Sequence, residues 1–207
     1  MTDTTPSPDL TIDFVGGAVG YRQRHGGGLG QALCKAAGFG KGRVPEVVDA
    51  TAGLGRDSFL LASMGARVTM IERSAEVHAL LRDALERARA AGPDHAAIVD
   101  RMTLLHGDAR QLLPGLAPEV VLVDPMHPPR KNSALVKKEM RVLRELVGAD
   151  PDSFELMQAA LACARKRVVL KWPLRADPMA GLPRPSHQIV GKTTRYDVFM
   201  ILDNGAS

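Results

Sequence analysis

The chain has 207 residues, of which 45% are hydrophobic and 24% are charged, a balance typical of one soluble globular domain. Only 4% are aromatic, so the core must consist mainly of aliphatic side chains. No apolar run approaches the ~20 residues that cross a bilayer, and the N-terminus lacks the basic start and apolar stretch of a signal peptide. We therefore expect no membrane association and a cytoplasmic location.

Cysteine and histidine are not arranged as metal ligands. Cys34 and Cys163 are far apart, and neither belongs to a Cys-x-x-Cys pair, so the sequence predicts neither a disulfide framework nor a zinc site. The six histidines show no ligand spacing either. We expect no bound metal.

The net charge of +4 is unevenly distributed along the chain. Residues 14–43 carry +5 and ten of the twenty glycines, and residues 130–146 carry +4, which leaves −5 for the rest. If the fold brings the two basic segments together, they would form a surface for a polyanion such as RNA, although charge alone favours two solvent-exposed faces. The candidate RNA-binding residues are Arg22, Arg24, Arg130, Lys131, Lys137, Lys138 and Arg141.

Three parts are expected in chain order. Residues 1–13 are polar and predict a disordered tail, and the Gly-rich basic segment 14–43 ends in a short helix over 29–37. Residues 44–203 are expected to form the single folded domain. No internal repeat is visible.

Within this domain, short apolar runs alternate with amphipathic stretches, which is typical of βα units. Runs of Val and Leu without polar alternation indicate strands buried on both faces, as in a parallel sheet. The last two strands have no helix between them, which predicts a hairpin and an antiparallel final strand. Strands are expected at 47–49, 68–71, 102–105, 120–123, 168–170, 188–190 and 196–202, and helices at about 56–64, 75–91, 109–113, 133–147 and 153–164.

One acidic residue follows each of four successive predicted strands. These residues are Asp49, Glu72, Asp108 and Asp124. Ligands of doubly wound sheets bind beyond the carboxyl ends of the strands, so we expect the four carboxylates to surround one ligand. Each of them, taken alone, also fits a structural role as a turn or helix cap.

The glycine turn after the first strand distinguishes between ligands. Gly53 and Gly55 are followed by Arg56 and Asp57, without the third glycine of a dinucleotide-binding turn. Asp57 would repel a diphosphate and suits a cationic ligand, such as the sulfonium of S-adenosylmethionine. With Glu72 placed to accept hydrogen bonds from ribose hydroxyls and Asp108 from an adenine amino group, S-adenosylmethionine is favoured over the nicotinamide cofactor of an oxidoreductase.

The turn after the fourth strand, Asp124-Pro125-Met126-His127, fits the methylation of an amine on a base. Such an amine is a poor nucleophile, because its lone pair is delocalised into the ring. A carboxylate that accepts one N–H bond, with a proline-fixed carbonyl accepting the other, would aim the nitrogen and stabilise its developing charge. We therefore expect Asp124 and Pro125 to act on the substrate and His127 to stack on a flipped base, although a Pro-rich turn with a helix cap and an ordinary loop histidine would fit as well.

Several unusual strings resemble the ribosomal small subunit methyltransferase J family, which methylates guanine N2 in bacterial 16S ribosomal RNA. They are the strings 49–57 (DATAGLGRD), 124–126 (DPM) and 131–141 (KNSALVKKEMR). The resemblance implies a Rossmann-like class I methyltransferase with a seven-stranded sheet. With the glycine turn, the expected cofactor-binding residues are Asp49, Gly53, Gly55, Arg56, Asp57, Glu72, Arg73, Asp108, Ala109 and Asp124.

The expected activity is direct in-line transfer of a methyl group from S-adenosylmethionine to guanine N2, in 16S ribosomal RNA or the small ribosomal subunit. Neither cysteine is placed to attack a base, so no covalent enzyme intermediate is expected. The alternatives are an amine methyltransferase acting on DNA or on a protein glutamine, and a noncatalytic RNA-binding assembly factor of the same fold.

Overall fold

The computed structural model describes residues 11–16, 30–40, 42–125 and 152–202. The glycine run 26–28, His127 and the helix expected over 133–147 lie outside these ranges. All seven candidate RNA-binding residues lie outside them as well.

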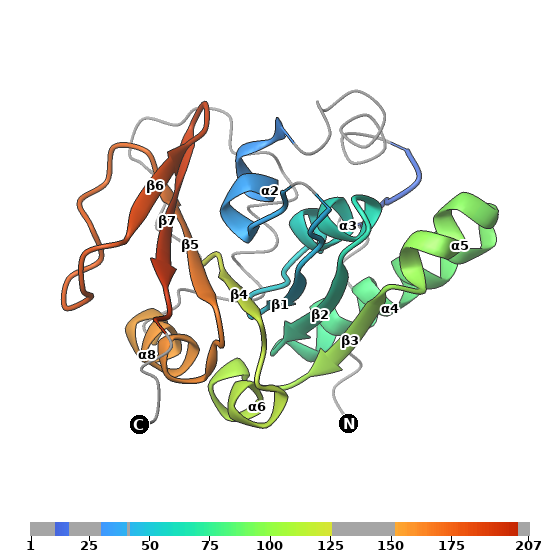
Figure 1. Ribbon diagram of the computed structural model, residues 1–207. Helices are drawn as coiled ribbons and strands as arrows, with labels where there is room; N and C mark the ends of the chain where they lie inside the picture. Colours follow the sequence, from blue (N-terminus) through green and yellow to red (C-terminus); the bar gives the residue numbers. More distant parts are fainter. Residues whose placement is uncertain (1–10, 17–29, 41, 126–151, 203–207) are drawn as a thin grey trace, which may run out of the picture.

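The core element is a seven-stranded sheet with strand order β3-β2-β1-β4-β5-β7-β6 (Figure 1). The first five strands along the chain pair in parallel, and β7 is antiparallel to both β5 and β6. The predicted mostly parallel sheet with an antiparallel C-terminal strand is therefore confirmed. The strands are β1 (Glu46–Asp49), β2 (Arg67–Glu72), β3 (Met102–His106), β4 (Val120–Val123), β5 (Arg167–Pro173), β6 (His187–Val190) and β7 (Thr194–Met200).

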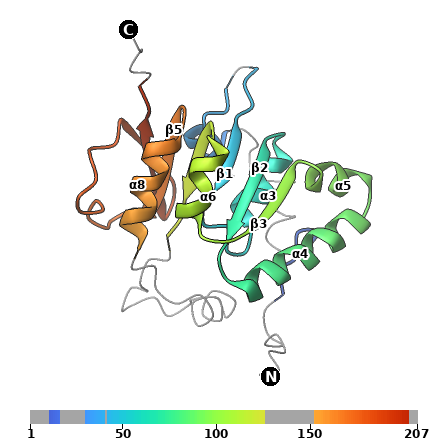
Figure 2. The same cartoon turned by 90° about the horizontal axis from the view of Figure 1, so that it is seen from below.

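Helices cover both faces of this sheet, because successive side chains of a strand point to opposite faces. Val47 belongs to the core on the face of α2, α3, α4 and α5, whereas Val48 belongs to the core under α6 and α8. Figure 2 shows α6 and α8 side by side. The helices are α2 (Ala32–Ala37), α3 (Arg56–Ser63), α4 (Ala75–Ala90), α5 (Pro93–Val99), α6 (Ala109–Leu116) and α8 (Ser153–Cys163).

Helix boundaries follow local signals in most places. The Ser74 hydroxyl accepts a hydrogen bond from the backbone N–H of Val77, and Ser74 is therefore the N-cap of α4. Gly38, at φ +90°, caps the end of α2. None of the helices in the described part of the chain is long and apolar enough to cross a membrane.

Two helix predictions were wrong. Gly92 and Pro93 do end α4, but α5, which was not predicted, starts immediately at Pro93, because a proline at the first helical position loses no intrahelical hydrogen bond. Helix α6 was expected to end before Pro114 but continues to Leu116. Burial of Ala109 and Leu113 against the sheet holds this helix in place despite the hydrogen bond that proline removes.

The chain before residue 16 contributes to the core. Phe14 is 1% exposed and stacks on Phe59 of α3, with ring centroids 4.7 Å apart. Ile12 is buried too, and its carbonyl accepts a hydrogen bond from Arg87 of α4. The division into a tail, a Gly-rich segment and a domain stays a prediction, but the residues on both sides of the 13/14 boundary pack on the same core.

At the amino ends of β1, β4 and β5, Glu119 joins three segments. Its carboxylate accepts hydrogen bonds from Arg43 Nη2 at 2.7 Å, Lys166 Nζ at 2.9 Å and the backbone N–H of Glu46 at 3.3 Å. Burial opposes the charge, but these partners lower the pKa of Glu119 to about 2. The ion pairs therefore stabilise the folded chain at neutral pH.

We expect Glu119→Gln to lower the free energy of unfolding at pH 7 by about 1 to 2 kcal/mol, a modest value because both cations are partly exposed. A lowered pKa contributes stability above the ordinary value of 4.5, and this contribution is lost as the pH falls toward 2. The variant should show a flatter pH dependence in this window in urea unfolding. Glu86→Gln, on the exposed face of α4, is the control. Equal pH profiles for wild type and Glu119→Gln would contradict this role.

Candidate active site

The parallel register brings the carboxyl ends of β1, β2 and β4 to one edge of the sheet. Asp49, the last residue of β1, lies level with Met70 of β2 and Leu122 of β4. A cavity of about 310 Å³ opens at this edge, in the size range of small-molecule sites. It is lined by nine of the predicted cofactor-binding residues: Asp49, Gly53, Arg56, Asp57, Glu72, Arg73, Asp108, Ala109 and Asp124.

The other two predicted residues in the described ranges are buried and do not belong to the cavity wall. Gly55 adopts φ +66°, and a Cβ atom there would lie 2.8 Å from Cδ2 of Leu81 and 3.0 Å from Cζ of Phe14. The conformation and the packing of the turn therefore require this glycine. Pro125 is buried directly after Asp124.

Asp49 is the most deeply buried carboxylate of the site, at 3% exposure. Its oxygens accept hydrogen bonds from the Ser58 hydroxyl and the backbone N–H of Thr51. Burial raises the pKa of Asp49 to about 7, and the neighbouring carboxylates of Asp57 and Asp124 act in the same direction. A positively charged ligand in the cavity would therefore favour the charged form of Asp49.

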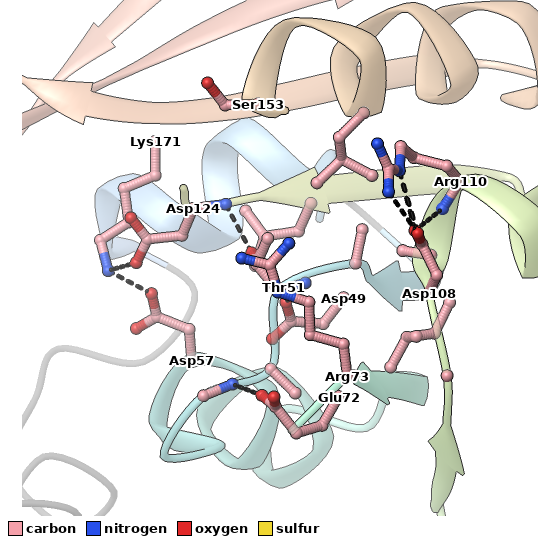
Figure 3. A pocket seen from close by; sticks show the side chains of 18 of the residues that line it. Asp49, Thr51, Asp57, Glu72, Arg73, Asp108, Arg110, Asp124, Ser153 and Lys171 are labelled. Carbon is pink, nitrogen blue, oxygen red and sulfur yellow. Dashed lines mark hydrogen bonds and ion pairs between the residues drawn. The ribbon is translucent and has the colours of Figure 1, made fainter. Parts of the chain in front are cut away.

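Thr51 connects the turn after β1 to the turn after β4. Its hydroxyl accepts a hydrogen bond of 2.7 Å from the backbone N–H of Asp124 (Figure 3). The backbone of Asp124 is thus fixed to the cofactor turn. Sequence reasoning did not assign Thr51 a role, because a threonine between two alanines carries no signal of a contact 73 residues away.

Glu72 orients the glycine turn. One oxygen of its carboxylate accepts a hydrogen bond from the backbone N–H of Gly53 at 2.9 Å, and the other accepts one from Ser74 N–H at 2.8 Å. The residue is 5% exposed, and burial raises the pKa of Glu72 above its ordinary value. Glu72 therefore lies at the end of β2 and on the cavity wall, as expected for one of the carboxylates that surround the ligand.

Just after β3, the neighbour of β2 in the sheet, Asp108 caps helix α6 and pairs with the Arg110 guanidinium, which lowers the pKa of the Asp108 carboxyl. Arg110 also contacts Asp152, 3.1 Å away, and Arg73 donates to both oxygens of Asp152 at 3.1 Å. The ends of β2 and β3 are therefore linked to the start of α8. Arg110 and Asp152 were not predicted; Asp152 meets Arg73 and Arg110 only because the fold brings the start of α8 to the ends of β2 and β3.

The central cation of the site is Lys171 of β5, which sequence reasoning also missed. Its Nζ donates to Asp57 Oδ2 at 2.7 Å and to Asp124 Oδ2 at 2.6 Å (Figure 3). Burial disfavours the ammonium, but the carboxylates of Asp124 and Asp57 more than compensate and raise the pKa of Lys171. The available signal was a lysine interrupting the otherwise apolar run 168–172 (VVLKW).

The wall of the cavity has an excess of acid. Six carboxylates face four basic side chains, so the site suits a ligand with positive charge better than an anionic one. The described residues contain no group of three or more side chains arranged to hold a metal ion. Of the predicted catalytic set, Asp124 lies at the cavity, Pro125 beside it, and His127 outside the described residues.

Comparison with known proteins agrees with this geometry. A family model of SAM-dependent methyltransferases matches residues 2–201. The chain is 71% identical over 195 residues to the ribosomal RNA small subunit methyltransferase J of Agrobacterium fabrum, covering 94% of both chains. It is 66% identical over 200 residues to the protein of that name from Brucella anthropi, covering 97% of this chain and 98% of that one.

The crystal structure of the SAM-dependent methyltransferase NGO1261 from Neisseria gonorrhoeae has the same fold, with a TM-score of 0.74 and 34% identity. The similarity covers 99% of this chain and 78% of that one. The fold, the acidic cavity at the carboxyl edge of the sheet and the two near-full-length relatives all agree. The chain belongs to the ribosomal RNA small subunit methyltransferase J family, whose members are S-adenosylmethionine-dependent methyltransferases.

Proposed function

We propose that this chain transfers the methyl group of S-adenosylmethionine to the exocyclic N2 amino group of a guanine in 16S ribosomal RNA. The observation that carries the proposal is the position of Asp124, at the end of β4 and on the wall of the cavity. Its backbone is fixed by Thr51 and its side chain by Lys171. The names of the relatives supply the ribosomal substrate class.

The cavity residues fit S-adenosylmethionine by their chemistry. Glu72 would accept hydrogen bonds from ribose hydroxyls, and Asp108 would accept one from an adenine amino group. Asp49 and Asp57 supply negative charge for the sulfonium end of the molecule. When bound, the cofactor supplies an electrophilic methyl group on a positively charged sulfur.

For the target base, the chain supplies orientation and charge. The Asp124 carboxylate would accept an N–H bond of the guanine amino group, which aims the nitrogen at the methyl donor and stabilises positive charge as it develops. No covalent bond between enzyme and base is needed. Pro125 would hold the backbone carbonyl that accepts the second N–H bond.

The RNA partner would be held by the two basic segments of the sequence, through phosphate contacts of Arg22, Arg24, Arg130, Lys131, Lys137, Lys138 and Arg141. Such contacts supply affinity independent of sequence, so the base specificity has to come from the pocket. Naked 16S ribosomal RNA and the assembled small subunit are both candidate substrates. A cytoplasmic location follows from either one.

Asp124→Ala should keep the affinity for S-adenosylmethionine within a few-fold and lower kcat on the order of 100-fold or more, because orientation of the amine is lost. Calorimetry and methyl transfer to undermethylated small-subunit RNA measure the two effects. Asp94→Ala, on the exposed surface of α5, is the control. Unchanged kcat in Asp124→Ala would reject the proposed role, and transfer to DNA or glutamine in preference to RNA would reject the substrate.

Asp49 predicts a pH dependence of both stability and cofactor binding. Its raised pKa means that the protonated carboxyl stabilises the fold below the ordinary value of 3.8, and that this contribution is lost as the pH rises toward 7. A cationic cofactor favours the charged form, so affinity should rise by up to about tenfold between pH 6 and pH 8.

Asp49→Asn should abolish this rise in S-adenosylmethionine affinity and flatten the pH dependence of the melting temperature between pH 4 and 7. S-adenosylhomocysteine, which lacks the sulfonium charge, is the matched control ligand, and its affinity should change less with pH in the wild type. Calorimetric titrations at the two pH values test the idea. An equal rise for both ligands in both proteins would assign the pH dependence to another group.

The double variant Lys137→Ala/Lys138→Ala should weaken RNA binding at all sequences alike and reduce the slope of log affinity against log salt by about 1 to 2. Filter binding between 50 and 200 mM salt would measure the slope. Arg82→Ala, on the exposed face of α4, is the control. A salt-independent affinity of the wild type would contradict the assignment of the basic segments to phosphate.

A further inference from the structure

We infer that Lys171 is a positioning residue for methyl transfer: its ammonium group holds the Asp124 carboxylate in the orientation in which it receives the target amine. This inference rests on the proposed role of Asp124. Lys171 contacts the Asp124 carboxylate and would act on the target amine through that carboxylate.

Lys171 lies between the turn after β4, which carries Asp124, and the start of α3, which carries Asp57. It lies on β5, next to β4 in the sheet, and its Nζ bridges Asp124, after β4, and Asp57, in the first turn of α3. The Lys171 side chain is 22% exposed and that of Asp57 is 13% exposed, so water competes little for the Asp57 contact. Asp124, at 40%, is open toward the cavity.

Electrostatics explains why a cation is needed at this point. Asp49, Asp57 and Asp124 lie close enough that the charges of Asp57 and Asp124 act on the pKa of Asp49. Carboxylates grouped in this way repel one another and favour protonation of one member. An ammonium between two of them offsets that repulsion, and its two short hydrogen bonds fix the directions of both side chains.

The side chain and the backbone of Asp124 are held by different residues. Thr51 accepts the hydrogen bond of the backbone N–H, which positions the turn, but it leaves rotation about the side-chain bonds unrestricted. The contact with Lys171 removes that rotation. Orientation of the carboxylate is the property that a correctly aimed amine requires, since a misplacement of about 1 Å can cost on the order of 100-fold in rate.

The positive charge of Lys171 also separates this role from one in cofactor binding. An ammonium in the cavity opposes a sulfonium, so its removal should leave the affinity for S-adenosylmethionine equal or higher, relative to that for neutral-sulfur S-adenosylhomocysteine. Removal of a residue that binds the cofactor's positive charge would lower the affinity for S-adenosylmethionine relative to S-adenosylhomocysteine. Removal of a purely structural residue would change the affinity for both ligands alike.

The test compares Lys171→Met, which keeps the length of the side chain, with Lys171→Arg, which keeps the charge. We expect Lys171→Met to lower kcat about 10- to 100-fold. The ratio of the affinity for S-adenosylmethionine to that for S-adenosylhomocysteine should not fall in this variant. Lys171→Arg should keep at least about a tenth of the wild-type kcat. Lys166→Met is the matched control, because it also breaks a lysine–carboxylate pair, but at the opposite edge of the sheet.

Each result decides the inference. Wild-type kcat in Lys171→Met, a fall in the affinity ratio, or a folded but inactive Lys171→Arg would overturn it. If circular dichroism shows that Lys171→Met is unfolded, the kcat of folded Lys171→Arg tests the inference instead. Unchanged kcat in Asp124→Ala would instead reject the proposed role of Asp124, on which this inference rests, so the two failures are distinguishable.

Discussion

The structure of this site depends on the burial of several carboxylates at one edge of a parallel sheet. Parallel pairing forces the ends of β1, β2 and β4 together, and each of these strands is followed by, or ends in, an acidic residue. Grouped carboxylates at low exposure cost free energy unless hydrogen bonds or cations compensate them. The hydrogen bonds and ion pairs around these carboxylates offset the free energy cost of their burial.

The compensation differs from one carboxylate to the next, and the difference matches the proposed roles. Glu72 receives backbone N–H groups and Asp108 receives an arginine from its own helix. Within the described residues Asp49 accepts hydrogen bonds from neutral donors, a hydroxyl and a backbone N–H, and burial raises the pKa of Asp49, so a cationic ligand would favour its charged form. Asp57 and Asp124 share Lys171.

The charge of this chain is unevenly distributed between the cavity and the two basic segments. The acidic cavity suits the positively charged cofactor, and the basic segments 14–43 and 130–146 are proposed to hold the RNA. Lys171 is one of the cations inside the acidic region, and its contacts with Asp57 and Asp124 explain its presence there. A chain with a small net charge can in this way contain two regions of opposite sign.

The alternation of strands and helices, the sheet class and most of the charged residues on the cavity wall could be predicted from the sequence. These features are local: apolar runs, a glycine turn, and an acidic residue at the end of each strand are visible within a few residues, and parallel pairing then places the strand ends together. Local reasoning failed where two signals competed. Pro93 begins a helix after ending another, and Pro114 is tolerated because the flanking residues of α6 are buried.

The side chains that compensate the buried carboxylates could not be predicted, because long-range contacts of the folded chain select them. Lys171 lies 47 residues from Asp124 and 114 from Asp57, and Thr51 lies 73 residues from Asp124, so no spacing in the sequence joins them. The packing at Gly55 is also long-range: Phe14 and Leu81 leave no space for a side chain at this position. Contacts of this kind arise when strand order brings distant segments together, and the strength of an electrostatic contact depends on burial that exists only in the folded chain.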